Sequence, residues 1–270
     1  MKLTFLGTAA AEAFPGVFCN CEHCIACRKL KGKNIRTRSQ AIVNDDLLID
    51  LPADTLHHFL TNDIEGDKIK YLLVTHSHSD HFYPNELHFR HPPFAHNARA
   101  EVLKAYLGEG AMNAYQTLGE RKNVEVEFLP LFTPTKIGDY EVTALPARHA
   151  PGDDARIFII KQGDKTMLYA HDTGYFFEEV FDYIKNNNVQ FDMITFDCTN
   201  VNLPISNEGG HMGILNINRV RERLADAIKP DAKLYINHFS HNGAPIHHEL
   251  EAQVQPMGLE VSYDGCVVEF

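Results

Sequence analysis

Three histidines and an aspartate fall within six residues, as His76, His78, Asp80 and His81, behind an apolar run over 69–75. That run is typical of a buried strand. In an extended chain, side chains two positions apart point the same way, so His76 and His78 can bind one metal ion together. Asp80 and His81 follow where the chain turns and can face a second ion. The alternative is a histidine-rich surface loop, which fits a lone histidine better than this cluster.

Three later residues that can also bind a metal come shortly after strand-like segments: His149 after 140–146, Asp172 after 165–170 and His238 after 234–236. Imidazole and carboxylate ligands suit zinc, manganese or iron. The order of the whole set resembles the metallo-β-lactamase superfamily. The resemblance implies two catalytic divalent metals, zinc or manganese, with iron as a further option.

The same resemblance implies a role for each of these residues. The first metal would be held by His76, His78 and His149, and the second by Asp80, His81 and His238. Asp172 would bridge the two ions. Asp80 is also a predicted catalytic residue.

Four of the six cysteines lie within nine residues, in a Cys-rich loop at about 15–39: Cys19, Cys21, Cys24 and Cys27. Such clustering in a cytosolic chain favours a metal site over disulfides. The cluster, Gly7-Thr8, Pro15 and a closing His238-x-x-His241 resemble the PhnP-like phosphodiesterase branch, whose members act on a cyclic ribose phosphate. The resemblance implies a structural zinc held by Cys19, Cys21, Cys24 and His241. Cys27 stays open as the alternative fourth ligand.

A glycine-flanked histidine, His211, precedes a predicted helix over 213–228. The glycines permit close approach, and a helix N-terminus favours an anion. The resemblance implies that His211 contacts the phosphate and assists the leaving group, and a plain helix-entry loop is the alternative.

Asn200 is a further candidate for substrate binding. Arg36 and Arg38 could bind phosphate or lie solvated on the surface.

Composition bounds the class of protein. The 270 residues are 44% hydrophobic and 23% charged, as in soluble globular proteins, and one domain spanning 1–270 is the simplest division. The net charge of -11 disfavours long nucleic acids but is compatible with a small anionic substrate. No signal peptide and no 18-residue apolar run is visible, so we expect a cytoplasmic protein without membrane contact. A homodimer remains open.

Hydrophobic periodicity predicts an α/β protein, and the resemblance implies the four-layer αβ/βα sandwich of the metallo-β-lactamase type. Strands are expected at 2–6, 40–44, 46–50, 69–75, 124–129, 140–146, 156–161, 165–170, 191–197 and 234–236, with a closing strand pair at 259–269. Helices are expected at 52–60, 101–118, 176–185, 213–228 and 246–254, and residues 8–39 should be turn-like.

The leading functional hypothesis is a metal-dependent hydrolase, favoured as a phosphoric diester hydrolase that attacks a small or cyclic phosphate ester through a metal-bridged hydroxide. Within the same fold, alternatives are a PqqB-like protein of cofactor biosynthesis, a tRNA-processing nuclease, and a lactone or thioester hydrolase. A metal-binding sensor is the alternative that is not an enzyme.

Overall fold

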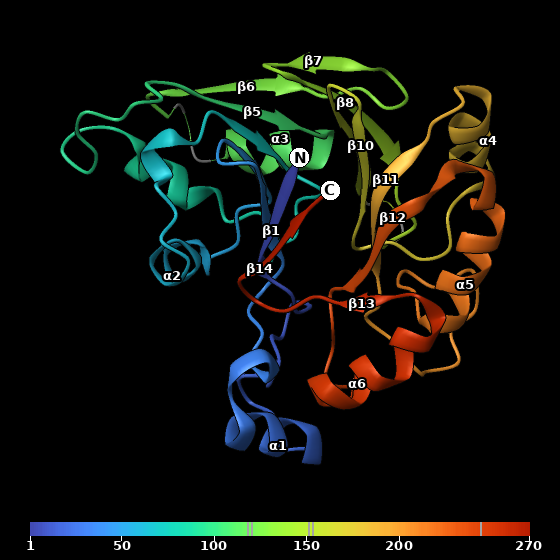
Figure 1. Cartoon of the computed structure of the whole chain (residues 1–270). Helices are drawn as coiled ribbons and strands as arrows, with labels where there is room; N and C mark the ends of the chain where they lie inside the picture. The colour runs from blue at the N-terminus through green and yellow to red at the C-terminus, as the bar shows by residue number, and fades with distance from the viewer. Residues whose placement is uncertain (118, 120, 151, 153, 244) are drawn as a thin grey trace.

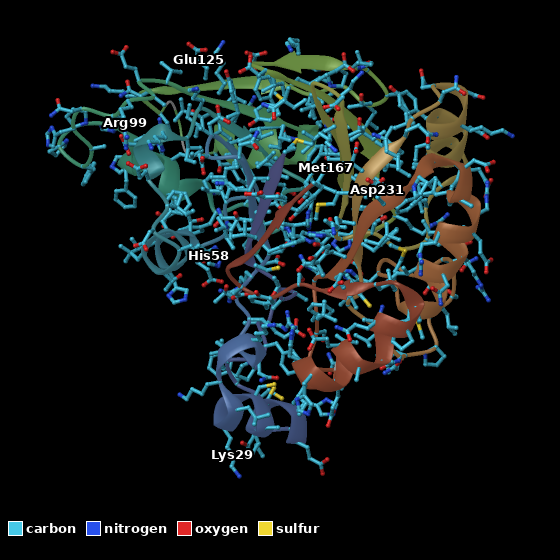
Figure 2. All side chains as sticks on the ribbon, in the orientation of Figure 1. Lys29, His58, Arg99, Glu125, Met167 and Asp231 are labelled. Atoms are coloured by element: carbon cyan, nitrogen blue, oxygen red, sulfur yellow. The ribbon has the colours of Figure 1, made fainter. Side chains whose placement is uncertain are left out.

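Two mixed sheets face each other in the computed structural model (Figure 1). The structure describes residues 1–270 except 118, 120, 151, 153 and 244. Along one strand, Met167 and Tyr169 point into the core between the sheets, whereas Leu168 and Ala170 point toward the helices behind. Figure 2 shows Met167 at the centre of the molecule. Because strand side chains alternate, each sheet buries both of its faces.

The first sheet has the strand order β14-β1-β2-β3-β4-β5-β6. Its strands are β1 (Lys2–Gly7), β2 (Gln40–Val43), β3 (Leu47–Ile49), β4 (Tyr71–Leu73), β5 (Leu103–Leu107), β6 (Val124–Phe128) and β14 (Cys266–Glu269). The strands from β3 to β6 run parallel, while β1 pairs antiparallel with both β14 and β2. The strands predicted at 40–44 and 46–50 are confirmed as β2 and β3, which pair antiparallel as a hairpin with Asn44 in its turn at a φ of 51°.

The second sheet has the order β13-β12-β11-β10-β9-β8-β7. Its strands are β7 (Thr135–Ile137), β8 (Tyr140–Pro146), β9 (Arg156–Gln162), β10 (Lys165–Ala170), β11 (Phe191–Asp197), β12 (Ile228–Asn237) and β13 (Glu260–Val261). The strands from β10 to β13 run parallel, and β9 is antiparallel to both of its neighbours. The short edge strand β7 was not expected from the sequence.

Helices other than α1 cover the outer faces of the two sheets. The helices are α1 (Glu22–Leu30), α2 (Thr55–Thr61), α3 (Glu109–Gln116), α4 (Glu178–Asn186), α5 (Ile214–Arg223) and α6 (His247–Val254). Short 3₁₀ turns lie at Gly32–Asn34, Gly66–Lys68, Pro84–Arg90, Ala225–Ala227 and Gln255–Met257. Separate hydrophobic cores fill the space between the sheets and behind each sheet. The four-layer αβ/βα fold is therefore confirmed.

The predicted helix over 101–118 is wrong in its first half, and its residue 118 lies outside the described residues. Residues 103–107 form β5, which lies between β4 and β6 with parallel pairing on both sides. A short apolar run fits a buried strand as well as a helix, and its neighbours in the sheet decide between them. Only α3 remains of the predicted helix.

Three further expectations are corrected. The loop over 8–39 contains α1, which projects from the body of the molecule with Lys29 at its far end (Figures 1 and 2). The helix predicted over 213–228 ends at Arg223, and its predicted last residue, 228, already belongs to β12. The segments at 259–269 are not a pair, because β13 joins β12 and β14 joins β1, in different sheets.

Among the described residues, no helix is both long enough and apolar enough to cross a membrane.

Candidate metal centre

The predicted metal ligands converge at one edge of the two sheets, just beyond the carboxyl ends of the strands. His76 follows β4, Asp172 follows β10 and His238 follows β12. Ends of parallel strands are where open α/β sheets place polar side chains around a common site. The ligand atoms form three overlapping groups, each within 4.8 Å: His76, His78 and His149; His76, His81 and Asp172; Asp80, His81 and His238. The sequence-predicted set is therefore brought together in full.

The buried histidines are each held through Nδ1. His76 Nδ1 lies 3.1 Å from Thr75 Oγ1, and His81 Nδ1 lies 2.7 Å from Asp50 Oδ2. His238 Nδ1 lies 2.8 Å from Thr199 Oγ1. Since Nδ1–H donates to a fixed oxygen in each case, the lone pair of Nε2 is turned toward the centre of the site.

Four inward-facing atoms are buried without a hydrogen-bond partner among the described residues: His76 Nε2, His81 Nε2, His238 Nε2 and Asp172 Oδ2. His81 Nε2 and His238 Nε2 approach Asp172 Oδ2 to 2.7 and 2.8 Å, but without the geometry of a hydrogen bond. Unpaired buried polar atoms are costly unless an ion satisfies them. This donor set fits a pair of divalent cations.

The negative charge of Asp172, at the centre of the predicted ligands, is also consistent with cation binding. Burial acts to raise the pKa of Asp172, but His238 and His81 hold it well below its usual range. Asp172 is therefore a carboxylate, able to lie between two cations.

Three residues around the site adopt left-handed backbone conformations without being glycine. The φ angles are 65° at Asp50, 50° at Asp172 and 65° at His238. Each comes directly or within two residues after the strand that carries it, so the turn aims its side chain across the strand ends. Such backbone costs on the order of 1–3 kcal/mol per residue and persists where the surroundings enforce it.

One side of the centre is open to solvent. His78 is exposed, and Asp80 and His149 are half-buried. His149 Nε2 lies 3.2 Å from His78 Nδ1. A ligand approaching from this side meets His78, Asp80 and His149 first, whereas His76 and His81 lie behind them.

His211 lies beside this opening, as expected for a residue that contacts substrate. Its Nδ1 lies 2.9 Å from Asp197 Oδ2, and its ring stacks on His238 with centroids 5.5 Å apart. Burial disfavours the imidazolium, but the Asp197 carboxylate raises the pKa of His211 to about 9. A Cβ at Gly210 would come within 3.0 Å of the His149 carbonyl, so this loop needs a small residue to pack there.

Asn200 supports the same loop. Its side-chain Nδ2 donates to the His211 carbonyl at 3.4 Å, and its backbone N–H donates to the Met212 carbonyl at 3.0 Å. These contacts position His211, while contact of Asn200 with substrate stays a prediction.

The Cys-rich segment forms a second group. Atoms of Cys19, Cys21, Cys24 and His241 all lie within 4.8 Å of one another. His241 Nδ1 is 3.6 Å from the sulfurs of both Cys19 and Cys21. The backbone N–H of Cys24 lowers the pKa of Cys21 to about 6, whereas burial raises the pKa of Cys24 to about 12. The arrangement has the ligand number and types of a tetrahedral zinc site.

Cys27, the alternative fourth ligand, is buried and packs in the hydrophobic core behind the second sheet. Burial raises the pKa of its thiol. The geometry favours His241 over Cys27.

Of the two arginines singled out in the sequence, Arg36 is buried and Arg38 is half-buried. Arg36 is buried, with Nη1 donating to Thr8 Oγ1 at 2.9 Å and to the Ser262 carbonyl at 2.7 Å. Arg38 forms an ion pair with Asp54 at 3.2 Å. Arg36 thus joins segments distant in the sequence, and these contacts occupy both arginines.

The residues that orient the histidines were not predicted from the sequence; they are Asp50, Thr75 and Thr199. Asp50 also accepts from the backbone N–H and the hydroxyl of Thr75, at 2.8 and 2.9 Å. The sequence did contain a feature that points to Asp50, because this residue follows the apolar strand Leu47–Ile49 much as His76 follows β4. Its partner His81 is distant in sequence, so spacing alone gave no pairing.

With this geometry in view, the chain belongs to the metallo-β-lactamase superfamily of metal-dependent hydrolases. The model of the beta-lactamase superfamily domain matches residues 47–239, which is most of the chain. No curated protein matches the sequence.

Solved structures share the fold at low sequence identity. A diphosphatase from the PhnP family is 21% identical with a TM-score of 0.75, over 100% of this chain and 97% of that one. Zinc-bound PqqB from Methylobacterium extorquens is 17% identical with a TM-score of 0.77, over 100% of both chains. The short form of human tRNase Z is 15% identical with a TM-score of 0.66, over 100% of this chain and 99% of that one.

Proposed function

We propose that this protein is a phosphodiesterase that hydrolyses a small or cyclic phosphate ester at a dinuclear metal centre. The observation that carries the proposal is the convergence of seven ligands beside a histidine held by a carboxylate. Similarity to a diphosphatase of the PhnP family agrees with phosphoryl chemistry. The second candidate is a PqqB-like role, favoured by the equally complete match to that fold.

The proposed division of ligands follows the three groups of atoms. One cation would be held by His76, His78 and His149, and the other by Asp80, His81 and His238, with Asp172 between them. Bound there, two divalent cations would supply Lewis acidity to the phosphoryl oxygens and ionise a water at neutral pH.

The protein's own residues provide orientation and a proton. Asp50, Thr75 and Thr199 fix the tautomers and ring positions of the buried histidines. His211, protonated beside Asp197, can donate from Nε2 to the departing alkoxide. An alkoxide is a poor leaving group, so this donation lowers the barrier. Asp197 also accepts from the Met212 N–H at 3.1 Å, which holds the loop in place.

A second, structural zinc site is proposed at Cys19, Cys21, Cys24 and His241. Because His238 and His241 are three residues apart, the zinc would anchor the α1 segment next to a catalytic ligand.

A substrate screen tests the proposal. The protein, loaded with Mn²⁺ or Zn²⁺, is assayed with bis-p-nitrophenyl phosphate, cyclic ribose phosphates, lactones and β-lactams. We expect turnover of the phosphodiesters, with cyclic ribose phosphates among the better substrates. Turnover of lactones alone, or of no ester while metal is fully bound, would overturn it.

A further inference from the structure

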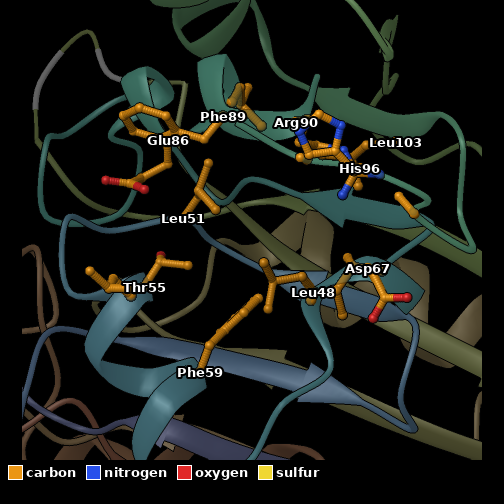
Figure 3. Close-up of a pocket in the computed structure, with 16 residues that line it drawn as sticks. Leu48, Leu51, Thr55, Phe59, Asp67, Glu86, Phe89, Arg90, His96 and Leu103 are labelled. Carbon is orange, nitrogen blue, oxygen red and sulfur yellow. The ribbon is translucent and has the colours of Figure 1, made fainter. Parts of the chain in front are cut away.

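A cavity of about 350 Å³ lies behind the first sheet, between β3, α2 and the 3₁₀ turn Pro84–Arg90 (Figure 3). Its walls include the buried side chains of Leu48, Leu51 and Leu103. None of the seven proposed catalytic ligands is among its described lining residues. This volume falls within the range of small-molecule sites, which are concave and mostly apolar.

The cavity has different charges at its two ends. Figure 3 shows Arg90 and His96 on one side and Glu86 on the opposite side. Among the described residues, no carboxylate forms an ion pair with Arg90. Its Nη2 donates to the Ala100 carbonyl at 2.9 Å, and its buried Nε has no hydrogen-bond partner.

An acid on that side, Asp67, attracts the Arg90 guanidinium but is hydrogen-bonded to another arginine. Asp67, which also lines the cavity, accepts from Arg99 Nε at 2.5 Å and from Arg99 Nη2 at 2.7 Å. The guanidinium of Arg90 is therefore a half-buried cation that only shares the charge of Asp67 with Arg99. A charge-assisted hydrogen bond to an anion in the cavity would supply further negative charge.

We propose that this cavity is a binding site for a small amphipathic anion, with its apolar chain among the leucines and its carboxylate at Arg90. Glu86 repels the anionic head from the other end, so the ligand binds in one orientation. The wall residue Leu51 exchanges backbone hydrogen bonds with the segment that carries His81, since Leu51 N–H donates to the His81 carbonyl at 2.7 Å. The site is thus separate from the metal centre but adjoins it.

Titration calorimetry of the metal-loaded full chain with octanoate, and separately with 1-octanol, tests this inference. We expect one octanoate per chain, with a dissociation constant of about 1 mM or tighter. Arg90→Gln should weaken octanoate binding roughly 10-fold and leave octanol binding within about 2-fold. Lys104→Gln, which removes a positive charge from β5 outside the cavity, is the matched control and should change neither.

A second pair of variants compares a tryptophan that would fill part of the cavity with one that would not, both at exposed positions outside the core. Leu56 and Leu60 both lie on α2 and are both exposed, but only Leu56 lines the cavity. Leu56→Trp should weaken binding of both ligands at least about 10-fold, because the indole fills space that the chain needs. Leu60→Trp should bind both ligands as the wild type does.

Three outcomes would overturn the inference. One is no heat of binding with octanoate up to about 5 mM. Another is octanoate binding that Leu56→Trp leaves unchanged, which would place the carboxylate elsewhere, for example on the metals. The third is an Arg90→Gln variant in which the affinities for octanol and octanoate fall equally. That result would show that the guanidinium does not bind the carboxylate.

Discussion

Asp197 makes His211 suited to proton donation, and it does so by position as well as by charge. Asp197 Oδ1 accepts from Thr199 N–H and Oγ1–H, both at 3.0 Å, while Oδ2 faces His211. The carboxylate is fully buried and cannot turn away. His211 is thereby presented at the open side of the site with Nδ1 occupied and Nε2 available.

Replacing His211 with Gln tests this role through the leaving group. If His211 protonates the departing oxygen, hydrolysis of an alkyl phosphodiester should fall about 100-fold or more. Hydrolysis of bis-p-nitrophenyl phosphate should fall far less, because p-nitrophenolate leaves without a proton. Metal content by mass spectrometry should stay at the wild-type value. Equal losses on both substrates would instead indicate that His211 orients substrate or binds metal.

At the scale of elements, α1 depends on its proposed zinc. The helix has only two buried side chains, Cys24 and Cys27, so its own packing contributes little. A site that ties Cys24 to His241 would replace a missing core with coordination bonds.

The two buried cysteines of α1 provide a matched test. Cys24→Ala should remove one zinc per chain and make α1 susceptible to proteolysis. Cys27→Ala should keep the zinc and cost only packing, on the order of 1 kcal/mol. Metal analysis and limited proteolysis of both variants give the answer. If Cys27→Ala loses the zinc while Cys24→Ala keeps it, the ligand assignment is wrong.

Helix α2 is held by a buried neutral histidine. His58 Nδ1 lies 2.6 Å from Gln40 Oε1, and Nε2 lies 2.7 Å from Thr37 Oγ1. Burial lowers the pKa of His58 to about 4. Below pH 6.5 His58 becomes protonated in the unfolded chain but stays neutral in the folded chain. The free energy of unfolding therefore decreases as pH falls from about 6.5 to about 4.

We therefore expect His58→Gln to be less sensitive to acid than the wild type. Between pH 7 and pH 5, its free energy of unfolding should drop by roughly 1–2 kcal/mol less, since the variant lacks the titrating group. Urea denaturation at several pH values measures this. The exposed neighbour His57 supplies the control, and His57→Gln should follow the wild-type pH profile. Parallel profiles for all three proteins would contradict the expectation.

At the scale of the whole molecule, the proposed metals join the two sheets. His76 and His81 follow β4 of the first sheet, whereas His149, Asp172 and His238 belong to the second. Cations shared by these residues would act as links across the inter-sheet core.

Removing the metals should consequently destabilise the entire fold. With free metal at about 100 times its dissociation constant, a single site adds about 2.7 kcal/mol to the free energy of unfolding. Chelation should lower the melting temperature by several degrees, and added Zn²⁺ or Mn²⁺ should restore it. A melting temperature unmoved by chelation, in protein verified as metal-free, would argue against ions between the sheets.

Sequence reasoning succeeded where the signal is local and failed where a partner is remote. His76 and His78 follow an apolar strand at a spacing that points both side chains the same way, so their meeting at one metal site could be anticipated. The burial of Arg36 could not, because its acceptors lie more than two hundred residues away or in another loop. The helix prediction for residues 103–107 was wrong for a similar reason, since the neighbours of β5 in the sheet, and not its own periodicity, make it a strand.

The placement of β1 between β14 and β2 bears on how the protein is made. Lys2 pairs with Glu269, so β1 acquires this neighbour only after the intervening strands of both sheets have been synthesised. Until then one edge of β1 offers unpaired backbone groups, the kind of surface that chaperones protect. Every strand of the second sheet precedes β14 in the chain. Because contacts of such long sequence separation form slowly, we expect closure of the first sheet to be the slow step of folding.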